Sequence, residues 1–126
     1  MQTVLIIDRN PSLAEALAAQ LSVPGERSCM GAASDNPIAR IREAEVDLVI
    51  LDPCDLEEDL EQFCATLLDG SGKPRLLSYS FTVSRPAIQE ALGAGFHGCM
   101  SKYSTLIQLE AAQAHLLVIF QVSLNL

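Results

Sequence analysis

The sequence has few basic residues and no cluster of them: eight lysines and arginines stand against sixteen acidic side chains, giving a net charge of −8. A nucleic-acid-binding surface needs gathered basic side chains, so we expect no direct contact with nucleic acid. A long apolar run is also lacking. The most apolar segment, HLLVIFQVSLNL at 115–126, is too short to span a bilayer. The N-terminal MQTVLIID has no basic region ahead of a long apolar stretch, so we expect no signal peptide and no membrane contact.

Two further absences concern enzyme and metal sites. The four cysteines are widely spaced, and neither a CxxC pair nor a Cys/His cluster with zinc spacing occurs among Cys29, Cys54, Cys64 and Cys99. This pattern favours reduced thiols and a cytoplasmic protein. No glycine-rich loop follows the first apolar run, which continues as DRNPS. A flavin-binding or phosphatase domain is therefore the weaker alternative, and we expect no enzyme activity of the chain's own.

Short apolar runs indicate the strands. TVLII (3–7) and VDLVILD (46–52) do not alternate with polar residues, which is typical of strands buried on both faces of a parallel sheet. PRLLSYS (74–80) is a third strand. RSCMGAA (27–33) is a weaker candidate, and FHGCMSK (96–102) is a short one that ends on Lys102.

Helical patterns separate these runs. PSLAEALAAQL (11–21) has Asn10 as its predicted N-cap and Leu13, Leu17 and Leu21 on one face. A second helix starts at Asp35-Asn36-Pro37 and runs to about Ala44. DLEEDLEQFCATLLDG (55–70) is predicted as a third, closed by Gly70, with acids in its first turn and an inner stripe of Leu56, Leu60, Phe63, Cys64 and Leu67. The last two helices are expected over 84–95 and 104–120.

The order is therefore strand then helix, five times over, without a linker or repeat. Because right-handed crossovers allow little else, the chain is predicted to be one α/β domain over residues 1–126, with a doubly wound parallel sheet and helices on both faces. In such a sheet, ligands bind beyond the carboxyl ends of the strands.

Polar residues stand at four of these strand ends: Asp8, Asp52, the pair Ser78 and Ser80, and Lys102. Two carboxylates, a hydroxyl and an ammonium at one edge suit phosphoryl transfer to a carboxylate. One aspartate would be the nucleophile, and the other would help to hold a divalent cation such as Mg²⁺. The competing interpretation makes both aspartates simple caps of the segments that follow them.

At this point the chain resembles the receiver domain of two-component response regulators. The matching stretches are VLIIDRNP (4–11), DLVILD (47–52), PRLLSYS (74–80) and ALGAGFHGCMSK (91–102). GAGFHGCMSK is similar to a pattern of receivers fused to helix-turn-helix output domains, which implies transcription regulation through a DNA-binding domain missing from this chain. The resemblance implies a flavodoxin-like sheet of five strands in the order 2-1-3-4-5, with five helices.

The resemblance also implies roles for single residues. Asp52 matches the phospho-acceptor, Asp8 the first of two paired acidic residues, and Lys102 the lysine of the pattern. Ser78 is the better match for the hydroxyl that responds to phosphorylation, although Ser80 fits the spacing to Lys102. Asp8, Asp52 and the backbone carbonyl of Cys54 match the Mg²⁺ ligands. A histidine kinase or a phosphotransfer protein would be the phosphoryl donor.

The chain departs from this pattern at several positions. Arg9 replaces the second acidic residue, and a guanidinium cannot ligate a metal ion. Arg9 could instead pair with Asp52 or Asp8, lower the pKa of the acceptor and stand in for the metal's charge, or it could be exposed and inert. The proline and glycine usual after the acceptor are absent, with Leu56 and Leu60 in their places. Cys99 occupies the aromatic switch position, and Tyr103 that of a frequent proline.

Two segments carry further alternatives. Cys54 beside Asp52 raises the possibility of redox chemistry, but packing as a small apolar residue is the favoured interpretation. The last helix has an apolar stripe that is too wide for one buried face, which predicts a homodimer or domain interface over the last two helices and last strand. The stripe comprises Leu106, Ile107, Leu109, Leu116, Leu117, Ile119 and Phe120.

Two functions follow from these observations. In the first, Asp52 takes a phosphoryl group and the domain then changes its dimer or partner interface. In the second, the chain is a pseudo-receiver, a binding module whose output no longer needs phosphate, because Arg9 replaces a metal-binding acid.

Overall fold

A computed structural model describes residues 1–68 and 74–118 of the chain, with side chains as far as Gln113. Its elements are β1 (Gln2–Asp8), α1 (Pro11–Leu21), β2 (Arg27–Ala33), α2 (Pro37–Ala44), β3 (Leu48–Leu51), the 3-10 helix η1 (Pro53–Asp55), α3 (Leu60–Leu67), β4 (Arg75–Ser80), α4 (Arg85–Ala94), β5 (Gly98–Ser101) and α5 (Leu106–Val118). Each predicted strand and helix is present.

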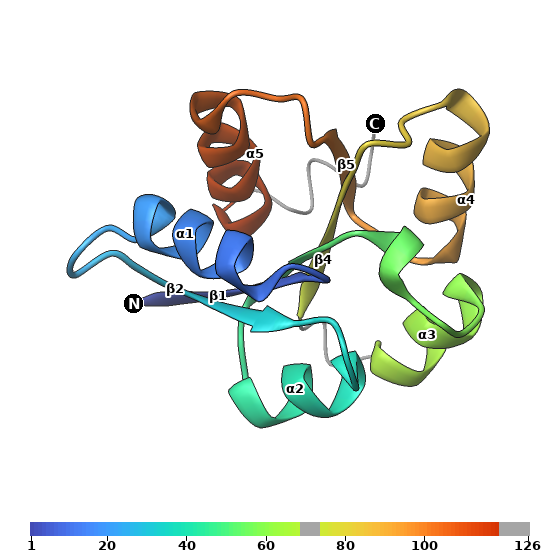
Figure 1. Ribbon diagram of the computed structural model, residues 1–126, viewed down its shortest axis with the longest axis horizontal. Coiled ribbons are helices and arrows are strands. Elements are labelled where there is room, and N and C mark those ends of the chain that lie inside the picture. Colours follow the sequence, from blue (N-terminus) through green and yellow to red (C-terminus); the bar gives the residue numbers. More distant parts are fainter. Residues whose placement is uncertain (69–73, 119–126) are drawn as a thin grey trace.

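The five strands form one parallel sheet in the order β2-β1-β3-β4-β5, which confirms the predicted topology. Figure 1 shows α1 and α5 on one face of this sheet and α2, α3 and α4 on the other. The neighbours of β1 are β2 on one side and β3 on the other, so the strand order reverses at β1. Loops that follow β1 and β3 therefore flank the crevice in which such sheets bind ligands.

Two apolar cores, one on each face, hold the helices to the sheet. The core under α2, α3 and α4 is built around Phe63, Val49 and Leu76. The core under α1 and α5 is built around Ile6 and Ile50, and alternate residues of the central strands point into one core or the other. Because both faces of β1, β3 and β4 are covered, their sequences have no polar alternation.

The face that α1 buries differs from the prediction. Leu21 is buried and Leu17 partly so, but Leu13 is 42 % exposed, and the contact with the sheet is made by Ala14 and Ala18. The reason lies in β2, where a Cβ at Gly31 would come within 2.5 Å of backbone atoms of α1. The helix packs so close to the sheet that small side chains, rather than leucines, must form its inner face.

The segment after β3 also differs from the prediction. Helix α3 begins at Leu60, not at residue 55, because Asp52 caps the short turn η1 and Asp59 caps α3 by accepting a hydrogen bond from the backbone N–H of Gln62. The acidic run between them is loop, so its charges do not belong to a helical first turn. Phe63, Cys64 and Leu67 are buried as predicted, and Leu56 and Leu60 pack against the same core from the side.

Two predictions fall outside the described residues: Gly70 as the end of the third helix, and the side chains of the second half of the apolar stripe of α5. In the first half of that stripe, Leu109 is buried while Ile107 is 81 % exposed. Within the described part of the chain, no helix is long and apolar enough to span a membrane.

Candidate functional site at the carboxyl edge of the sheet

Strand register brings the predicted site residues to one edge. Ile7 of β1 pairs with Leu51 of β3, so Asp8 and Asp52 are level with one another on adjacent strands. Lys102 follows β5, where its backbone N–H donates to the carbonyl of Ser80 at 2.9 Å. The structure thus brings both carboxylates, the lysine and the serine of β4 together, as predicted.

Lys102 lies between the two carboxylates. Its Nζ is 2.9 Å from Oδ2 of Asp8 and 3.0 Å from Oδ2 of Asp52, and all three side chains are less than a tenth exposed. The other oxygen of each aspartate accepts a hydrogen bond from the chain that follows: Oδ1 of Asp8 accepts from the N–H of Asn10, and Oδ1 of Asp52 accepts from the N–H of Cys54, both at 2.9 Å. The capping interpretation thus holds for Asp52, which caps η1, but not for Asp8, because Asn10 caps α1.

These contacts set the charge state of the cluster. Burial acts to raise the pKa of Asp52, but hydrogen bonds from the Cys54 N–H, Lys102 and Ser80, together with the charge of Lys102, outweigh it and lower that pKa. Burial acts to lower the pKa of Lys102, and its hydrogen bonds and ionic contacts with both aspartates raise it instead. At neutral pH Asp52 is therefore a carboxylate and Lys102 an ammonium.

The two serines of β4 have different partners. Ser80 contributes to the lowered pKa of Asp52, and its hydroxyl oxygen accepts from the backbone N–H of Thr82 at 3.1 Å. Ser78 lies two residues earlier in the strand, paired in register with Cys99, and acts against the burial that raises the pKa of the Cys99 thiol. Of the two serines that the sequence left open, Ser80 is the one that affects the pKa of Asp52.

Arg9 does not pair with Asp8 or Asp52, so that prediction is wrong. Its guanidinium contacts Oδ1 of Asp55 at 3.1 Å, and its backbone N–H donates to Oδ2 of the same residue, also at 3.1 Å. The side chain of Arg9 is 73 % exposed, whereas that of Asp55 is 8 % exposed. No sequence pattern pointed to Asp55, because we expected it inside the first turn of a helix.

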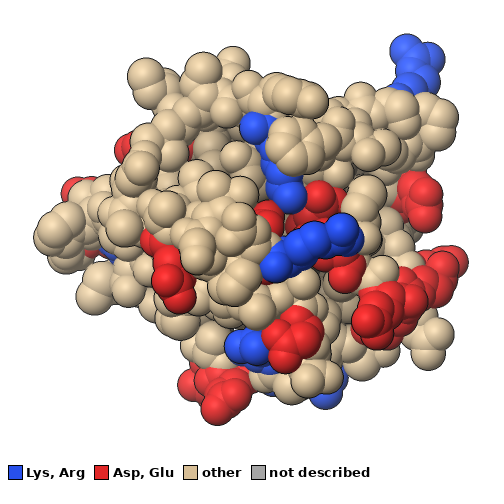
Figure 2. Space-filling view, viewed as in Figure 1, with Lys and Arg blue, Asp and Glu red and all other residues tan. Residues whose placement is uncertain are grey.

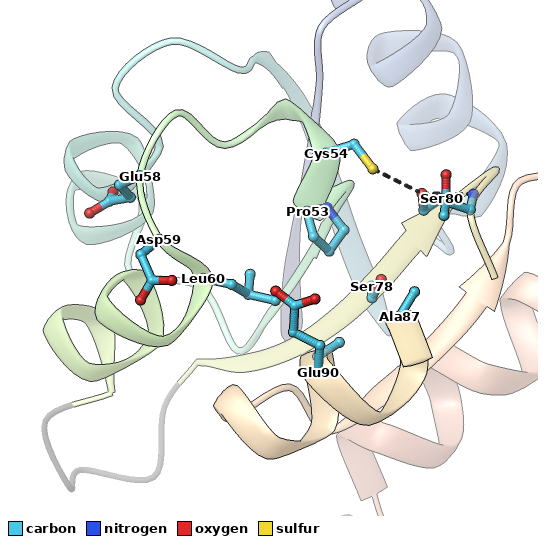
Figure 3. A pocket seen from close by; sticks show the side chains of 11 residues that line it. Pro53, Cys54, Glu58, Asp59, Leu60, Ser78, Ser80, Ala87 and Glu90 are labelled. Atoms are coloured by element: carbon cyan, nitrogen blue, oxygen red, sulfur yellow. Dashed lines mark hydrogen bonds between the residues drawn. The ribbon is translucent and has the colours of Figure 1, made fainter. Parts of the chain in front are cut away.

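Cys54 is exposed, which contradicts the prediction that it packs as an apolar residue. Its Sγ lies 3.8 Å from the Ser80 hydroxyl, at the end of a cavity of about 350 Å³ between η1, β4 and α4 (Figure 3). Figure 3 shows the carboxylate of Glu90 pointing into this cavity, between Leu60 and Ser78. The cavity begins at Pro53, next to Asp52, and gives Ser80 open space on one side.

An aromatic pair next to the site was not predicted. Phe81 and Tyr103 are exposed and meet edge to face, with ring centroids 4.9 Å apart, and the Phe81 ring lies 5.4 Å from Nζ of Lys102. Phe81 directly follows Ser80, and Tyr103 directly follows Lys102. Their positions in the sequence next to site residues could have predicted that they lie near the site. Figure 2 shows basic and acidic side chains in contact near the middle of this face, with further acidic side chains toward α3.

The fit of this site to Mg²⁺ follows from its donor atoms. Asp8 and Asp52 supply two carboxylates at the same level, and one or two carboxylates are the usual protein share of a magnesium site. Among the described residues, no group of three histidine, cysteine or acidic side chains is placed to hold a metal ion. The site thus suits a cation that keeps most of its waters, with Asp8, Asp52 and the carbonyl of Cys54 as the expected ligands.

Comparison with known proteins identifies the fold. No protein-family model and no curated protein matches the chain. Among solved structures, the signal receiver domain of the response regulator NarL from Mycobacterium tuberculosis has a TM-score of 0.76 and 23 % identity, over 90 % of this chain and 93 % of that one. The beryllofluoride-activated NtrC4 receiver domain dimer has a TM-score of 0.78 and 16 % identity, over 95 % and 99 %. A protein described as the pilus assembly protein CpaE, from Burkholderia thailandensis, has a TM-score of 0.74 and 16 % identity, over 91 % and 97 %. The chain therefore has the fold of the response-regulator receiver domains.

Proposed function

We propose that this domain is a response-regulator receiver that accepts a phosphoryl group on Asp52 from a histidine kinase or a phosphotransfer protein. One observation carries the proposal: a single ammonium, that of Lys102, is bound by both Asp8 and Asp52. The Ser80 hydroxyl is near enough to help lower the pKa of Asp52. The pKa of Asp52 is lowered, so the carboxylate is ionised at neutral pH and available as a nucleophile.

The transfer would proceed by in-line attack. A carboxylate oxygen of Asp52 forms the new O–P bond, the P–N bond of the donor phosphohistidine breaks, and the imidazole leaves with the bond's electron pair and takes up a proton. Lys102 and Ser80 would then turn from the carboxylate to the phosphoryl oxygens. Mg²⁺, held by Asp8, Asp52 and the carbonyl of Cys54, would neutralise charge on the phosphoryl oxygens.

The test is phosphorylation by acetyl phosphate, with and without Mg²⁺, followed by intact mass. We expect an adduct of about 80 Da, the mass of a phosphoryl group, that requires Asp52 and is lost in Asp52→Asn. Asp59→Asn is the matched control, because Asp59 caps α3 outside the cluster. The absence of an adduct from the wild type, in a sample that is folded by NMR, would refute the proposal.

We further propose that the output surface lies around β5 and the start of α5. Phe81, Tyr103 and Ile107 are exposed there, and clustered exposed apolar side chains often mark a protein interface. Homodimerisation should therefore strengthen when beryllofluoride occupies the site, as measured by sedimentation, and Ile107→Glu should abolish it. Leu13→Glu, at an exposed position of α1 outside this surface, is the control that should leave association unchanged.

A phosphorylation-independent binding module is the second candidate. The observation in its favour is that Arg9 stands beside Asp8 while the described residues provide no three-acid metal site. The acetyl-phosphate experiment separates the two candidates, since a binding module would need no adduct and its partner affinity would be unchanged in Asp52→Asn.

A further inference from the structure

The Arg9–Asp55 pair joins the two loops that carry the site's carboxylates. Asp55 belongs to η1, three residues after Asp52, and its N–H donates to the Asp52 carbonyl at 3.0 Å. Arg9 directly follows Asp8 at the end of β1. One carboxylate thus holds Arg9 at two points, through the backbone N–H and through the guanidinium.

The net charge of the neighbouring cluster explains why this contact matters. Asp8 and Asp52 share one ammonium, so the central cluster carries an excess negative charge that attracts a second cation. Arg9 is next to that cluster in sequence and has a long side chain. Asp55 supplies a competing carboxylate on the outer side, and the 73 % exposure of Arg9 places its guanidinium toward solvent rather than over the cluster.

We propose that Asp55 is a positioning residue that holds Arg9 away from the Asp8–Lys102–Asp52 cluster and so leaves both carboxylates open to a divalent cation and a phosphoryl group. The cation-binding part of this proposal rests on the proposed function, whereas the position of Arg9 does not. Without Asp55, the guanidinium would turn to the two shared carboxylates and repel a divalent cation. The structure thus explains how a chain with arginine at an acidic position can keep its pocket accessible.

The first test reads the position of Arg9 directly, by the NMR signal of its Nε–Hε group in the intact domain. In the wild type, Asp52→Asn should leave this signal in place, because Arg9 contacts Asp55. In an Asp55→Asn background, the same Asp52→Asn change should shift it. Asp35→Asn is the matched control: it releases Arg40 from a surface pair of 2.7 Å away from the cluster and should not affect Arg9.

The second test measures Mn²⁺ affinity by EPR, without any phosphoryl transfer. Asp55→Asn should weaken binding at least about tenfold, the order expected of a unit charge brought near a divalent ion. Asp55→Asn combined with Arg9→Gln should restore wild-type affinity, which a collapsed loop could not do. Failure of this rescue would overturn the proposal. So would Mn²⁺ binding by Arg9→Gln alone but not by the wild type, because Arg9 would then already obstruct the pocket.

Parallel phosphorylation assays separate this proposal from the proposed function. Suppose that the wild type forms no adduct, and that Asp52→Asn shifts the Arg9 NMR signal only in the Asp55→Asn background. The receiver function would then be refuted and the positioning role supported. Suppose instead that the wild type and Asp55→Asn form the adduct equally well, and that the Arg9 NMR signal is unchanged. The receiver function would then be supported and the positioning role refuted.

Discussion

Removal of the bridging lysine by Lys102→Met should destabilise the domain strongly, because two neighbouring carboxylates would lose their cation. At 3.0 Å and an effective dielectric constant of about 20, each ionic contact amounts to roughly 5 kcal/mol before desolvation. The cost of removing the charged groups from water on folding offsets much of this attraction. Removing one partner of a buried ion pair typically destabilises a protein by about 3 kcal/mol. By contrast, Asp52→Asn leaves one carboxylate on the ammonium, so it should cost much less stability than Lys102→Met.

Urea denaturation at neutral pH measures both variants without adding ions that screen the cluster. A loss of about 3 kcal/mol should lower the midpoint by roughly 2 M. Arg85→Met is the matched control, because it removes the same charge from an exposed position on α4 and should change stability by less than about 0.5 kcal/mol.

The pH dependence gives an independent test. In Lys102→Met the two carboxylates repel each other, so one folded-state pKa should rise above its unfolded value. Such a group stabilises the fold below the unfolded pKa, and this stability is lost as pH rises through the folded pKa. The variant should therefore regain stability, relative to wild type, as pH falls from about 7 to about 5. A constant difference over that range, or equal stability at neutral pH, would refute the assigned role of Lys102.

Three further predictions concern the surroundings of the site. Gly31→Ala should cost about 1–3 kcal/mol in urea denaturation through the clash with α1, whereas Gly93→Ala, in α4 with no atom within 4 Å, should gain about 1 kcal/mol. His97 accepts a hydrogen bond from the backbone N–H of Leu76, and its pKa is lowered mainly by burial and further by the charge of Arg75. The free energy of unfolding should therefore fall as pH drops below about 6.5, and His97→Gln should remove that fall. Phe81→Ala should cost about 0.5–1 kcal/mol through the lost contact with the Lys102 ammonium, and a smaller cost in a Lys102→Met background would verify the coupling.

Much of the fold was predictable because its signals are local. Uninterrupted apolar runs identified the central strands, and the polar residues that end them fell at one edge once the strands were taken as parallel. The convergence of Asp8, Asp52 and Lys102 needed only strand order and register. That part of the site is a consequence of topology.

The rest depended on contacts between segments distant in sequence. Helical spacing favoured Leu13 as a buried residue, but the close approach of α1 to Gly31 admits only small side chains there. Asp55, the partner of Arg9, lies 46 residues away in the 3-10 helix η1, where the sequence predicted the start of a longer helix. The sequence pattern therefore could not reveal this contact. Ser80 was favoured over Ser78 only when the hydrogen bond to Asp52 was in view.

The exposed aromatic pair has a spectroscopic consequence. The chain has no tryptophan, so its near-ultraviolet emission comes from two tyrosines. Tyr79 is buried in the core, whereas Tyr103 is 80 % exposed and touches the ring that lies over the bridging ammonium. We therefore expect the emission of Tyr79 to report on unfolding and that of Tyr103 on changes around the Lys102 ammonium. Comparison of the wild type with Tyr103→Phe would separate the two signals, so the domain carries an optical probe that needs no label.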